Sequence, residues 1–415
     1  MDTNILVCYI IKGDAMRMRK KIKVDSNRAV FHTGEVLTLV LLTCIISLFV
    51  GSMVTNRLNY KNNYNSNDKY IQNFINNYQY ILENYYGDID EETLMKGALS
   101  GMLSVLGDDY STLFDGTSAD NFNIQLDGNY DGVGVEIYKY DNKIIILRVF
   151  SDSPAEKAGL KSGDIILSVD GKNYTETSDL SSYIRNSDKN SFELEIIRDE
   201  ETKSVTLKRS EVTIPSVSSQ VYEKNGKKIG YIYIGIFANA TTKQFETKLK
   251  ELEDEQIDSL IIDVRNNSGG HLTTAVSILS NLLDKTHVIY QTETKNKTEK
   301  FYSNGKQTKT YPIVVLQNNA SASASELLSI ALKEEYGATV IGNVSYGKGT
   351  VQELVNSNSA EYKFTTKKWL SPKGNWINET GVKPDIEVEQ GDSYSDNPID
   401  ENDTQLQAAL NYLAP

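Results

Sequence analysis

The sequence is poor in the residue types that form disulfides and transition-metal sites. Its 415 residues include two cysteines, Cys8 and Cys44, and three histidines. Because both cysteines lie within the first 44 residues, the rest of the chain has no disulfide, thiolate ligand or cysteine nucleophile. Three histidines are too few for us to expect a dedicated transition-metal site. We therefore expect a function that needs neither a metal nor a cofactor.

Positive charge is scarce beyond the N-terminus. The formal net charge is −13 at pH 7, with +3 in residues 1–35 and −16 in the remainder. Binding to nucleic acid through phosphates needs a basic surface, so this balance argues against such a partner. A composition of 39% hydrophobic and 24% charged residues is typical of folded domains. At about 150 residues per domain, the length predicts two or three domains.

Long apolar runs are also lacking, apart from one near the N-terminus. Residues Val36 to Val54 read VLTLVLLTCIISLFVGSMV, which is 19 residues without a charge. At about 1.5 Å per residue this run can cross a hydrocarbon core of roughly 30 Å. The basic flank before it predicts a cytoplasmic N-terminus, with the long remainder outside the cell membrane. The alternative is a cleaved signal peptide, but no A-x-A-like site follows the run.

The order of the sequence patterns predicts a multidomain chain of the α+β and α/β classes. A cytoplasmic basic tail (1–35) precedes a transmembrane anchor (36–55), and the polar, asparagine-rich residues 56–67 read as a linker. The four later regions differ in hydrophobic period and in turn content. They are a helical cap region at 68–127, a β-rich domain at 128–212, an α/β core with crossover connections at 213–390, and a C-terminal helical segment at 391–415.

The first long motif lies in the β-rich region. It reads SPAEKAGLKSGDIILSVDG, from Ser153 to Gly171, and predicts a turn, a short helix, a buried strand and a second turn. With the upstream GVGV at residues 132–135, this pattern resembles PDZ domains, which are small and β-sandwich-like. The resemblance implies that the C-terminal tail of another protein adds a strand to a sheet edge. The alternative is an ordinary small β domain whose glycines only make turns.

The resemblance to PDZ domains also indicates where a peptide would bind. The terminal carboxylate is expected in a nest of backbone N–H groups at the glycine-containing loop, where glycine permits close approach. Leu180, Tyr183 and Ile184 on the following helix either line a side-chain pocket or pack in the core. Arg185, near the end of that helix, is expected to couple peptide binding to activity. The predicted peptide-binding residues are Gly132, Val133, Gly134, Val135 and Arg185.

A second motif places serines before a helix. Residues 313–338 read IVVLQNNASASASELLSIALKEEYGA, which predicts an apolar strand, a turn of small residues and an amphipathic helix. A serine on a strand-to-helix turn presents its hydroxyl near the positive end of the helix. Ser321, Ser323 and Ser325 all lie in this turn, so the pattern alone does not choose the nucleophile.

A serine nucleophile needs a base at neutral pH. His271 and His287 are the histidines of the α/β region, and Lys348 stands between two glycines in SYGKGTVQEL. A lysine can act as the base if burial lowers its pKa from about 10.4 to about 7–8. On the residues alone, Lys348 is a chemically coherent base and His271 is the alternative.

Taken together, these motifs resemble the signature of the C-terminal processing peptidases, also called tail-specific proteases. That family comprises PDZ-containing bacterial serine proteases with a Ser/Lys dyad. The stretch ASASASELLSIALKEEYGATVIGNVSYGKGTVQ carries most of the resemblance. ALSGMLSVLGDDYSTLF (98–114) and SPKGNWINETGVKPDIEV (371–388) extend it, with Asp109 where proline is usual. The resemblance implies an α/β serine protease core of the crotonase-like type.

The family pattern also assigns catalytic residues. Its nucleophile is the middle serine of the S-A-S-A-S-E run, 25 residues before the lysine, which corresponds to Ser323 and Lys348. An assisting glutamine follows the lysine by four residues and corresponds to Gln352. In a fully extended strand, Lys348 and Gln352 would lie about 13 Å apart, so their contact needs a bend near Gly349.

A third motif, IIDVRNNSGG at residues 261–270, predicts a buried strand followed by a polar, glycine-rich loop. The family resemblance implies that this loop supplies half of an oxyanion hole. By motif position, the Gly269 N–H would pair with the N–H of Ala324, the residue after the nucleophile. The alternative is a plain turn before a helix that begins near Thr273.

The expected function is that of a membrane-anchored extracytoplasmic serine endopeptidase. Its expected partners are proteins with free C-terminal tails. The apolar stripes of residues 68–114 and 404–413 predict a separate cap or a contact with a second copy of the chain, and packing within the chain is the alternative. Two other classes remain open. One is a catalytically inactive PDZ scaffold. The other is a nucleotide hydrolase, because GNVSYGKGT at 342–350 nearly spells a P-loop, with Gly349 in place of the Ser/Thr that binds magnesium.

Overall fold

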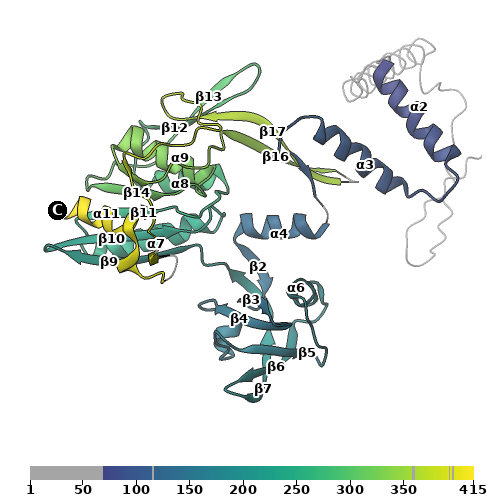
Figure 1. Ribbon diagram of the computed structural model, residues 1–415, viewed down its shortest axis with the longest axis horizontal. Helices are drawn as coiled ribbons and strands as arrows, with labels where there is room; N and C mark the ends of the chain where they lie inside the picture. The colour runs from purple at the N-terminus through teal and green to yellow at the C-terminus, as the bar shows by residue number, and fades with distance from the viewer. Residues whose placement is uncertain (1–68, 115, 358–359, 392, 395–396) are drawn as a thin grey trace, which may run out of the picture. The chain divides into compact units, whose positions relative to one another are not determined.

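The computed structural model describes residues 69–114, 116–357, 360–391, 393–394 and 397–415 (Figure 1). The chain divides into two compact units, Met1–Glu91 and Glu92–Pro415. The predicted basic tail, anchor and linker lie outside the described residues. Within the described ranges, no helix combines the length and apolar character that a membrane crossing requires.

Helix α2 (Lys69–Asn84) belongs to the first unit. Its apolar residues recur at helical spacing, as the sequence predicts, and none of its side chains is buried. Tyr70, Ile71 and Phe74 are among the large hydrophobic side chains that the helix exposes.

The second unit begins with α3 (Glu91–Ser104) and α4 (Gly116–Asp127), which are separated by the short strand β1 (Thr112–Leu113). The helical signals of the sequence end near Leu106, with Gly107 as the expected stop, and the structure ends α3 at Ser104. No pattern in the sequence indicates the strand at Thr112–Leu113. β1 pairs antiparallel with β17 (Ala360–Leu370). Its two residues lie opposite Lys363 and Tyr362 of β17. The pairing attaches residues 112–114 to the sheet that contains β16 and β17.

The β-rich region forms a five-stranded antiparallel sheet in the order β3-β4-β5-β6-β7, and β2 pairs separately with β8. Alternate residues of the strands point into one core, which the short helix α5 (Pro154–Lys157) and α6 (Thr177–Asn186) cover. The strands are β2 (Asn129–Gly132), β3 (Val135–Tyr140), β4 (Lys143–Val149), β5 (Ile165–Val169), β6 (Ser191–Arg198), β7 (Glu201–Lys208) and β8 (Ser210–Thr213).

The α/β region is built on a six-stranded sheet in the order β18-β15-β14-β11-β10-β9. All neighbouring strands are parallel except β9 and β10, which form a hairpin. The central parallel strands β11 and β14 are short and buried along their whole length, as expected where both faces of a sheet are covered. The strands are β9 (Val217–Lys224), β10 (Lys227–Ile234), β11 (Ser259–Asp263), β14 (Ile313–Gln317), β15 (Thr339–Gly342) and β18 (Ile386–Glu387).

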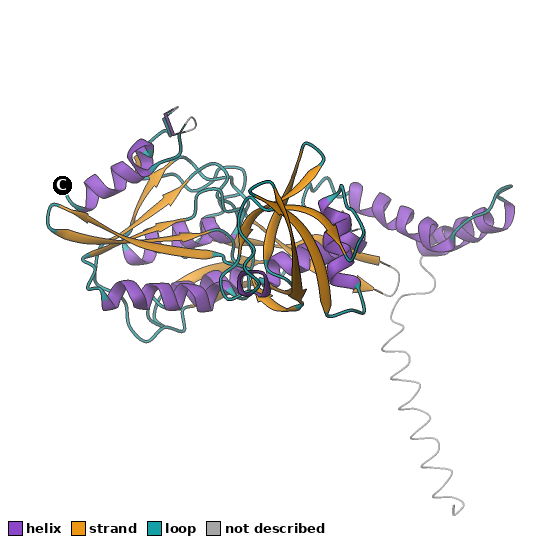
Figure 2. Cartoon of the chain, turned by 90° about the horizontal axis from the view of Figure 1, so that it is seen from below, coloured by secondary structure: helices purple, strands orange, loops and turns teal. Residues whose placement is uncertain are grey.

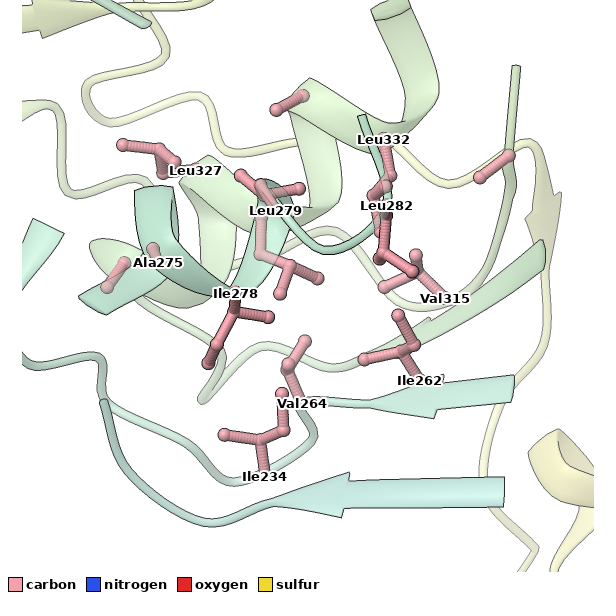
Figure 3. Packing of buried hydrophobic residues seen from close by; sticks show 14 of the residues in the cluster. Ile234, Ile262, Val264, Ala275, Ile278, Leu279, Leu282, Val315, Leu327 and Leu332 are labelled. Carbon is pink, nitrogen blue, oxygen red and sulfur yellow. The ribbon is translucent and has the colours of Figure 1, made fainter. Parts of the chain in front are cut away.

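Helices pack on both faces of this sheet. One face, which includes Ile262 and Val315, contacts α7, α8 and α9 in the largest core, and Figure 3 shows α8 side chains pointing toward these strands. The other face, which includes Ile261 and Val314, contacts α11. The helical elements are α7 (Thr241–Asp254), α8 (Leu272–Leu279), α9 (Ala324–Ala331), the π-helical turn η1 (Leu332–Tyr336), the 3-10 turn η2 (Asp400–Asn402) and α11 (Thr404–Leu413).

A second sheet carries the strand that follows the candidate lysine. Its order is β1-β17-β12-β13, and β16 pairs with the remaining edge of β17. Figure 2 shows the helices and strands of the chain by colour. Helices follow β10, β11 and β14 in the six-stranded sheet, whereas β6 to β10 follow one another without a helix between them. The further strands are β12 (Val288–Glu293), β13 (Thr298–Tyr302) and β16 (Thr350–Ser357).

Candidate active site

Three loops carry the candidate catalytic residues, and they follow β11, β14 and β15. These strands are neighbours and parallel, so their carboxyl ends meet at one edge of the sheet. This edge is where open α/β sheets usually place their sites. The topology therefore brings together segments near residues 265–270, 318–323 and 343–349.

Ser323 sits on a strained turn between β14 and α9. Its φ of 53° and ψ of −112° are unusual for a residue with a side chain. Such strain is concentrated at functional sites, where the surrounding structure holds it in place. Ala324 begins α9 immediately after it, and in the described part of the chain the Ala324 N–H has no hydrogen-bond partner. A donor is thus available beside the Ser323 hydroxyl.

The hydroxyl groups of the two neighbouring serines are hydrogen-bonded to backbone carbonyl groups of the adjacent loop. The Ser321 hydroxyl donates to the Val264 carbonyl at 2.8 Å, and the Ser325 hydroxyl donates to the Asn267 carbonyl at 2.8 Å. Both side chains are fully buried. Of the three serines, Ser323 is the one that is partly exposed. This geometry distinguishes it from the other two without reference to any family.

A buried carboxylate ties the serine turn to the lysine loop. Glu326, in the first turn of α9, accepts the Ser323 amide at 2.8 Å and the Lys348 amide at 2.9 Å on Oε2. Its Oε1 accepts the Ser345 hydroxyl and the Gly347 amide, each at 2.6 Å. Burial raises the pKa of Glu326, while these four donors favour its ionised form. The carboxylate therefore fixes both backbones at the site.

Lys348 lies in the loop between β15 and β16, with its side chain largely withdrawn from water. Burial lowers the pKa of Lys348 to about 8, and the positive charge of Lys363 adds to this effect, against Asp108 and Glu326. Its Nζ lies 4.5 Å from the ring centroid of Tyr110. Among the residues described, no hydrogen bond joins this Nζ to the Ser323 hydroxyl. The structure thus places the two loops together but not the two reactive atoms.

Gln352 lies on β16, next to an irregularity in its register with β17 between Val351 and Gln352. Its amide nitrogen donates to the hydroxyls of Thr350 and Thr365, at 2.9 and 3.0 Å. These bonds orient the side chain, and neither involves Lys348. Thr350 begins a strand rather than a helix. The nucleotide-hydrolase alternative is therefore wrong, because a P-loop lysine precedes a helix whose N-terminus receives the phosphate.

The glycine-rich loop after β11 packs directly against the serine turn. A Cβ added to Gly269 would lie 2.9 Å from Ser323 Cβ and 3.1 Å from the Ala324 nitrogen, so only glycine fits, at φ 107°. The Gly269 N–H donates to Asn267 Oδ1 at 2.8 Å. The Gly269 N–H, which the sequence predicts as an oxyanion-hole donor, is therefore adjacent to the serine. In this conformation it is hydrogen-bonded to Asn267 of its own loop.

A buried ion-pair network supports the same loop. The Arg265 guanidinium donates to Asp263 and to Asp403 at distances of 2.6 to 3.0 Å. Asp403 caps the N-terminus of α11 by accepting the Leu406 amide at 2.9 Å. The network connects the loop that contains Gly269 to the C-terminal helix.

The alternative base, His271, stands at the N-terminus of α8, where its amide donates to the Phe237 carbonyl. No hydrogen bond links its side chain to Ser323 within the described ranges. Across the same ranges, no group of three or more His, Cys, Asp or Glu side chains is arranged to hold a metal ion.

The predicted peptide-binding loop joins β2 and β3. Gly134 has φ 84°, and a Cβ there would lie 2.2 Å from Ser153 Cβ. β3, which begins at Val135, is the terminal strand of its sheet, so one edge of it has no partner among the described strands. Leu180 and Ile184 are buried in the core. Arg185 donates through Nε to the Ser181 carbonyl at 3.4 Å, within its own helix.

Three residues that the sequence analysis did not single out belong to this site. Glu326 is the third residue after Ser323, a spacing typical of a capping box, so a signal for it was present. Asn267 holds the Gly269 loop, and Tyr110 covers Lys348 from a segment more than 200 residues away. For neither of these does the local pattern give a signal.

Comparisons with protein families match three parts of the chain. Residues 228–388 match peptidase family S41, and residues 132–208 match the PDZ domain. Residues 47–118 match the family described as "Activating protease CtpB N-terminal domain". The three matches cover the catalytic, β-rich and N-terminal regions in that order.

Similar proteins include peptidases of the same organisation. The chain is 37% identical over 338 residues to the carboxy-terminal processing protease CtpB of Bacillus subtilis, covering 80% of this chain and 70% of that protein. It is 30% identical over 363 residues to a probable CtpA-like serine protease of Staphylococcus aureus, covering 86% and 71%. A solved structure, the photosystem II D1 C-terminal processing protease, matches with a TM-score of 0.46 at 26% identity, covering 76% and 86%.

Proposed function

Because the chain belongs to the C-terminal processing peptidases of peptidase family S41, which are serine-type proteases, we propose that it cleaves protein tails with Ser323 as nucleophile and Lys348 as general base. The observation that carries this proposal is the low pKa of Lys348, about 8, in a loop whose backbone shares the Glu326 carboxylate with Ser323. An ordinary lysine is protonated at neutral pH and cannot accept a proton. A lysine with a pKa near 8 is neutral in a useful fraction of molecules.

The chemistry follows from these groups. Neutral Lys348 takes the hydroxyl proton as the Ser323 oxygen forms a bond to the scissile carbonyl carbon. The resulting oxyanion is stabilised by backbone N–H groups, for which Ala324 and Gly269 are the proposed donors, each contributing about 3–4 kcal/mol. The lysine then gives its proton to the departing amine, which leaves an acyl-enzyme. A water molecule, deprotonated by the same lysine, releases the acyl group and restores the serine.

Two movements are needed for this reaction to proceed. The Lys348 side chain has to leave Tyr110 and reach the Ser323 hydroxyl, and the Gly269 N–H has to exchange Asn267 for the oxyanion. Both are local changes of a rotamer or a peptide plane, while Glu326 keeps the backbones in register. The Gln352 side-chain amide, which donates to Thr350 and Thr365, is proposed to orient the lysine side chain after that side chain has moved.

We further propose that substrate tails bind the free edge of β3, with the terminal carboxylate at residues Gly132 to Val135 and Arg185 coupling this binding to activity. The support is the unpaired edge and the close backbone approach at Gly134. Membrane anchoring by residues 36–54 with an extracytoplasmic catalytic part is also a proposal, and it rests on the sequence. Exposed apolar residues on α2 support the proposal of a homodimer, which light scattering of the purified protein tests.

A fluorescent peptide with a free apolar C-terminus tests the catalytic proposal. Ser323→Ala and Lys348→Ala should each abolish cleavage while binding of the peptide, measured by fluorescence anisotropy, is retained. Ser277→Ala and Lys250→Ala are matched controls, because these side chains make only local contacts on the helices α8 and α7. Cleavage that persists in Lys348→Ala would assign the base to another group, and His271→Ala would then be the next variant to measure. Activity should also survive a chelator.

A further inference from the structure

Tyr110 is held firmly although it lies in an irregular segment between α3 and β1. The Asp108 carboxylate accepts the Tyr110 amide at 3.2 Å and also accepts the Ser111 hydroxyl. The Ser111 hydroxyl oxygen in turn accepts the Thr365 amide of β17 at 3.2 Å. The next two residues pair with β17 as strand β1. The N-terminal segment is therefore fastened to the hairpin that follows Lys348, and Tyr110 is brought with it.

The Tyr110 ring is the group that the Lys348 amine contacts. Nζ lies 4.5 Å from the ring centroid, well within the range of a cation–π interaction. For this Nζ, no hydrogen bond and no ion pair is found among the described residues. The charged groups that act on the amine are Asp108 on the N-terminal segment, Glu326 on α9 and Lys363 on β17. The groups that act on the Tyr110 hydroxyl are Tyr346 on the lysine loop, Glu326 and Asp109.

We propose that Tyr110 is a positioning residue that holds the protonated Lys348 amine away from Ser323 and releases it when the amine becomes neutral. The attraction between an ammonium group and a ring face requires the positive charge. Loss of the proton therefore does two things at once, because it creates the base and removes the interaction that kept it from the serine. This inference rests on the proposed role of Lys348 and adds a residue from a distant part of the chain to the site.

The ring acts on Lys348 in two opposite ways. As an apolar wall it excludes water and favours the neutral amine, whereas its negative π face favours the charged amine. Two substitutions separate these effects. Tyr110→Phe keeps the wall and the π face and removes the hydroxyl together with its hydrogen bond with Tyr346. Tyr110→Leu keeps an apolar wall and removes the π face.

The test measures the Lys348 amine directly, without relying on peptide hydrolysis. Full-length protein carrying Ser323→Ala, so that the serine cannot react, is treated briefly with an amine-acylating reagent between pH 6 and pH 11. Mass spectrometry then gives the fraction of Lys348 modified at each pH, and the midpoint reports loss of its proton. Tyr110→Phe should keep the midpoint of the parent protein, near 8. Tyr110→Leu should lower the midpoint by about one pH unit, a tenfold gain in neutral amine below it.

In protein with Ser323 intact, the same two variants give a second measurement. Tyr110→Leu should move the pH profile of kcat/KM in the acidic direction by a similar amount, and Tyr110→Phe should leave it in place. If Tyr110→Leu does not fold, as judged by circular dichroism, Tyr110→Met provides an unbranched apolar side chain for the same comparison. Equal midpoints for the Phe and Leu variants, or a higher midpoint for Leu, would overturn the proposal. Activity in Lys348→Ala would instead refute the proposed function and leave the labelling result interpretable.

Discussion

The Glu326 carboxylate accepts the backbone amide of Lys348 at 2.9 Å, so the first turn of the helix behind Ser323 sets the position of the lysine loop. The same oxygen accepts the Ser323 amide, and both proposed catalytic residues therefore depend on one acceptor atom. Because the bonds go to backbone groups, the lysine side chain can change its rotamer while its Cα stays in place.

Replacing Glu326 by glutamine should destabilise the protein and reduce its activity. Glutamine keeps one acceptor oxygen, and its NH₂ group would face two backbone or hydroxyl donors that then lack an acceptor. We expect a loss of about 2–3 kcal/mol in the free energy of unfolding and at least a tenfold lower kcat. Urea unfolding and peptide hydrolysis measure the two effects.

Glu335→Gln is the matched control for this change, since Glu335 lies nine residues further along, in the π-helical turn η1, and contacts the His287 ring. It should lower stability by less than about 1 kcal/mol and leave kcat unchanged. If the two glutamine variants behaved alike, Glu326 would not be the link between the two loops.

The pH dependence of stability and of activity should both report Lys348. Its pKa in the folded protein, about 8, lies below the value near 10.5 of an unfolded chain. Between these values the unfolded chain binds more protons, so the free energy of unfolding should rise as the pH rises from 8 to 10.5. The rise is at most about 3 kcal/mol, and kcat/KM should rise with pH through about 8 as the neutral amine forms.

Lys348→Met isolates this contribution, because methionine retains an unbranched apolar chain and cannot be charged. It should abolish hydrolysis, be more stable than the parent protein at pH 7, and lose the part of the pH dependence described above. Stability curves that remained parallel for the two proteins from pH 7 to pH 10.5 would contradict a depressed lysine pKa.

The backbone strain at Ser323 should be measurable by comparing two inactive variants. Ser323→Ala keeps a Cβ at φ 53°, whereas Ser323→Gly relieves the clash. We expect the glycine variant to be more stable than the alanine variant by about 1–2 kcal/mol in chemical unfolding. At an unstrained helix N-cap, glycine already exceeds alanine by a few tenths to about 1 kcal/mol, so a difference below about 1 kcal/mol would argue against strain.

Loss of one carboxylate from the Arg265 network should cost much stability. Burial alone would raise the pKa of Asp403, but the Arg265 guanidinium outweighs it and holds that pKa below its usual value. Asp403→Asn leaves the guanidinium with a single charged partner, at a cost of about 3 kcal/mol. Asp400→Asn, three residues earlier at an exposed contact with Tyr222, should cost less than about 1 kcal/mol.

The activity of Asp403→Asn should also fall, measured under conditions in which the protein remains folded. Arg265 lies at the start of the loop that contains Gly269. Displacement of its guanidinium would therefore shift the Gly269 N–H, which is a proposed donor to the oxyanion. Full activity in a destabilised Asp403→Asn protein would show that the network supports the fold and not the site.

The strand–turn–helix unit around Ser323 could be predicted because its signals are local. Val314 and Val315 lie in a buried apolar strand, small residues allow the tight turn, and Leu327 and Leu328 point into the core as the helical period indicates. The same holds for the β-rich domain, whose turn residues and buried strands lie close together in the sequence. In these segments local preference and tertiary structure agree.

Two features of the site could not be predicted in this way: the contact of Tyr110 with Lys348 and the hydrogen bond from the Gly269 N–H to Asn267. Tyr110 reaches Lys348 because β1 pairs with β17, and a two-residue strand leaves no period to detect. The state of the Gly269 N–H depends on the rotamer of Asn267, which sequence patterns do not encode. The family pattern names the chemical groups, whereas their resting arrangement is set by contacts between segments far apart in the chain.

The Arg265 network also has a consequence for biosynthesis. The guanidinium pairs with Asp403, which lies 138 positions later in the chain, so a polypeptide still emerging from the ribosome contains a buried cation without its second anion. Until the final helix has been translated, the guanidinium at the start of the loop beside the serine lacks one of the two carboxylates that hold it in the folded protein.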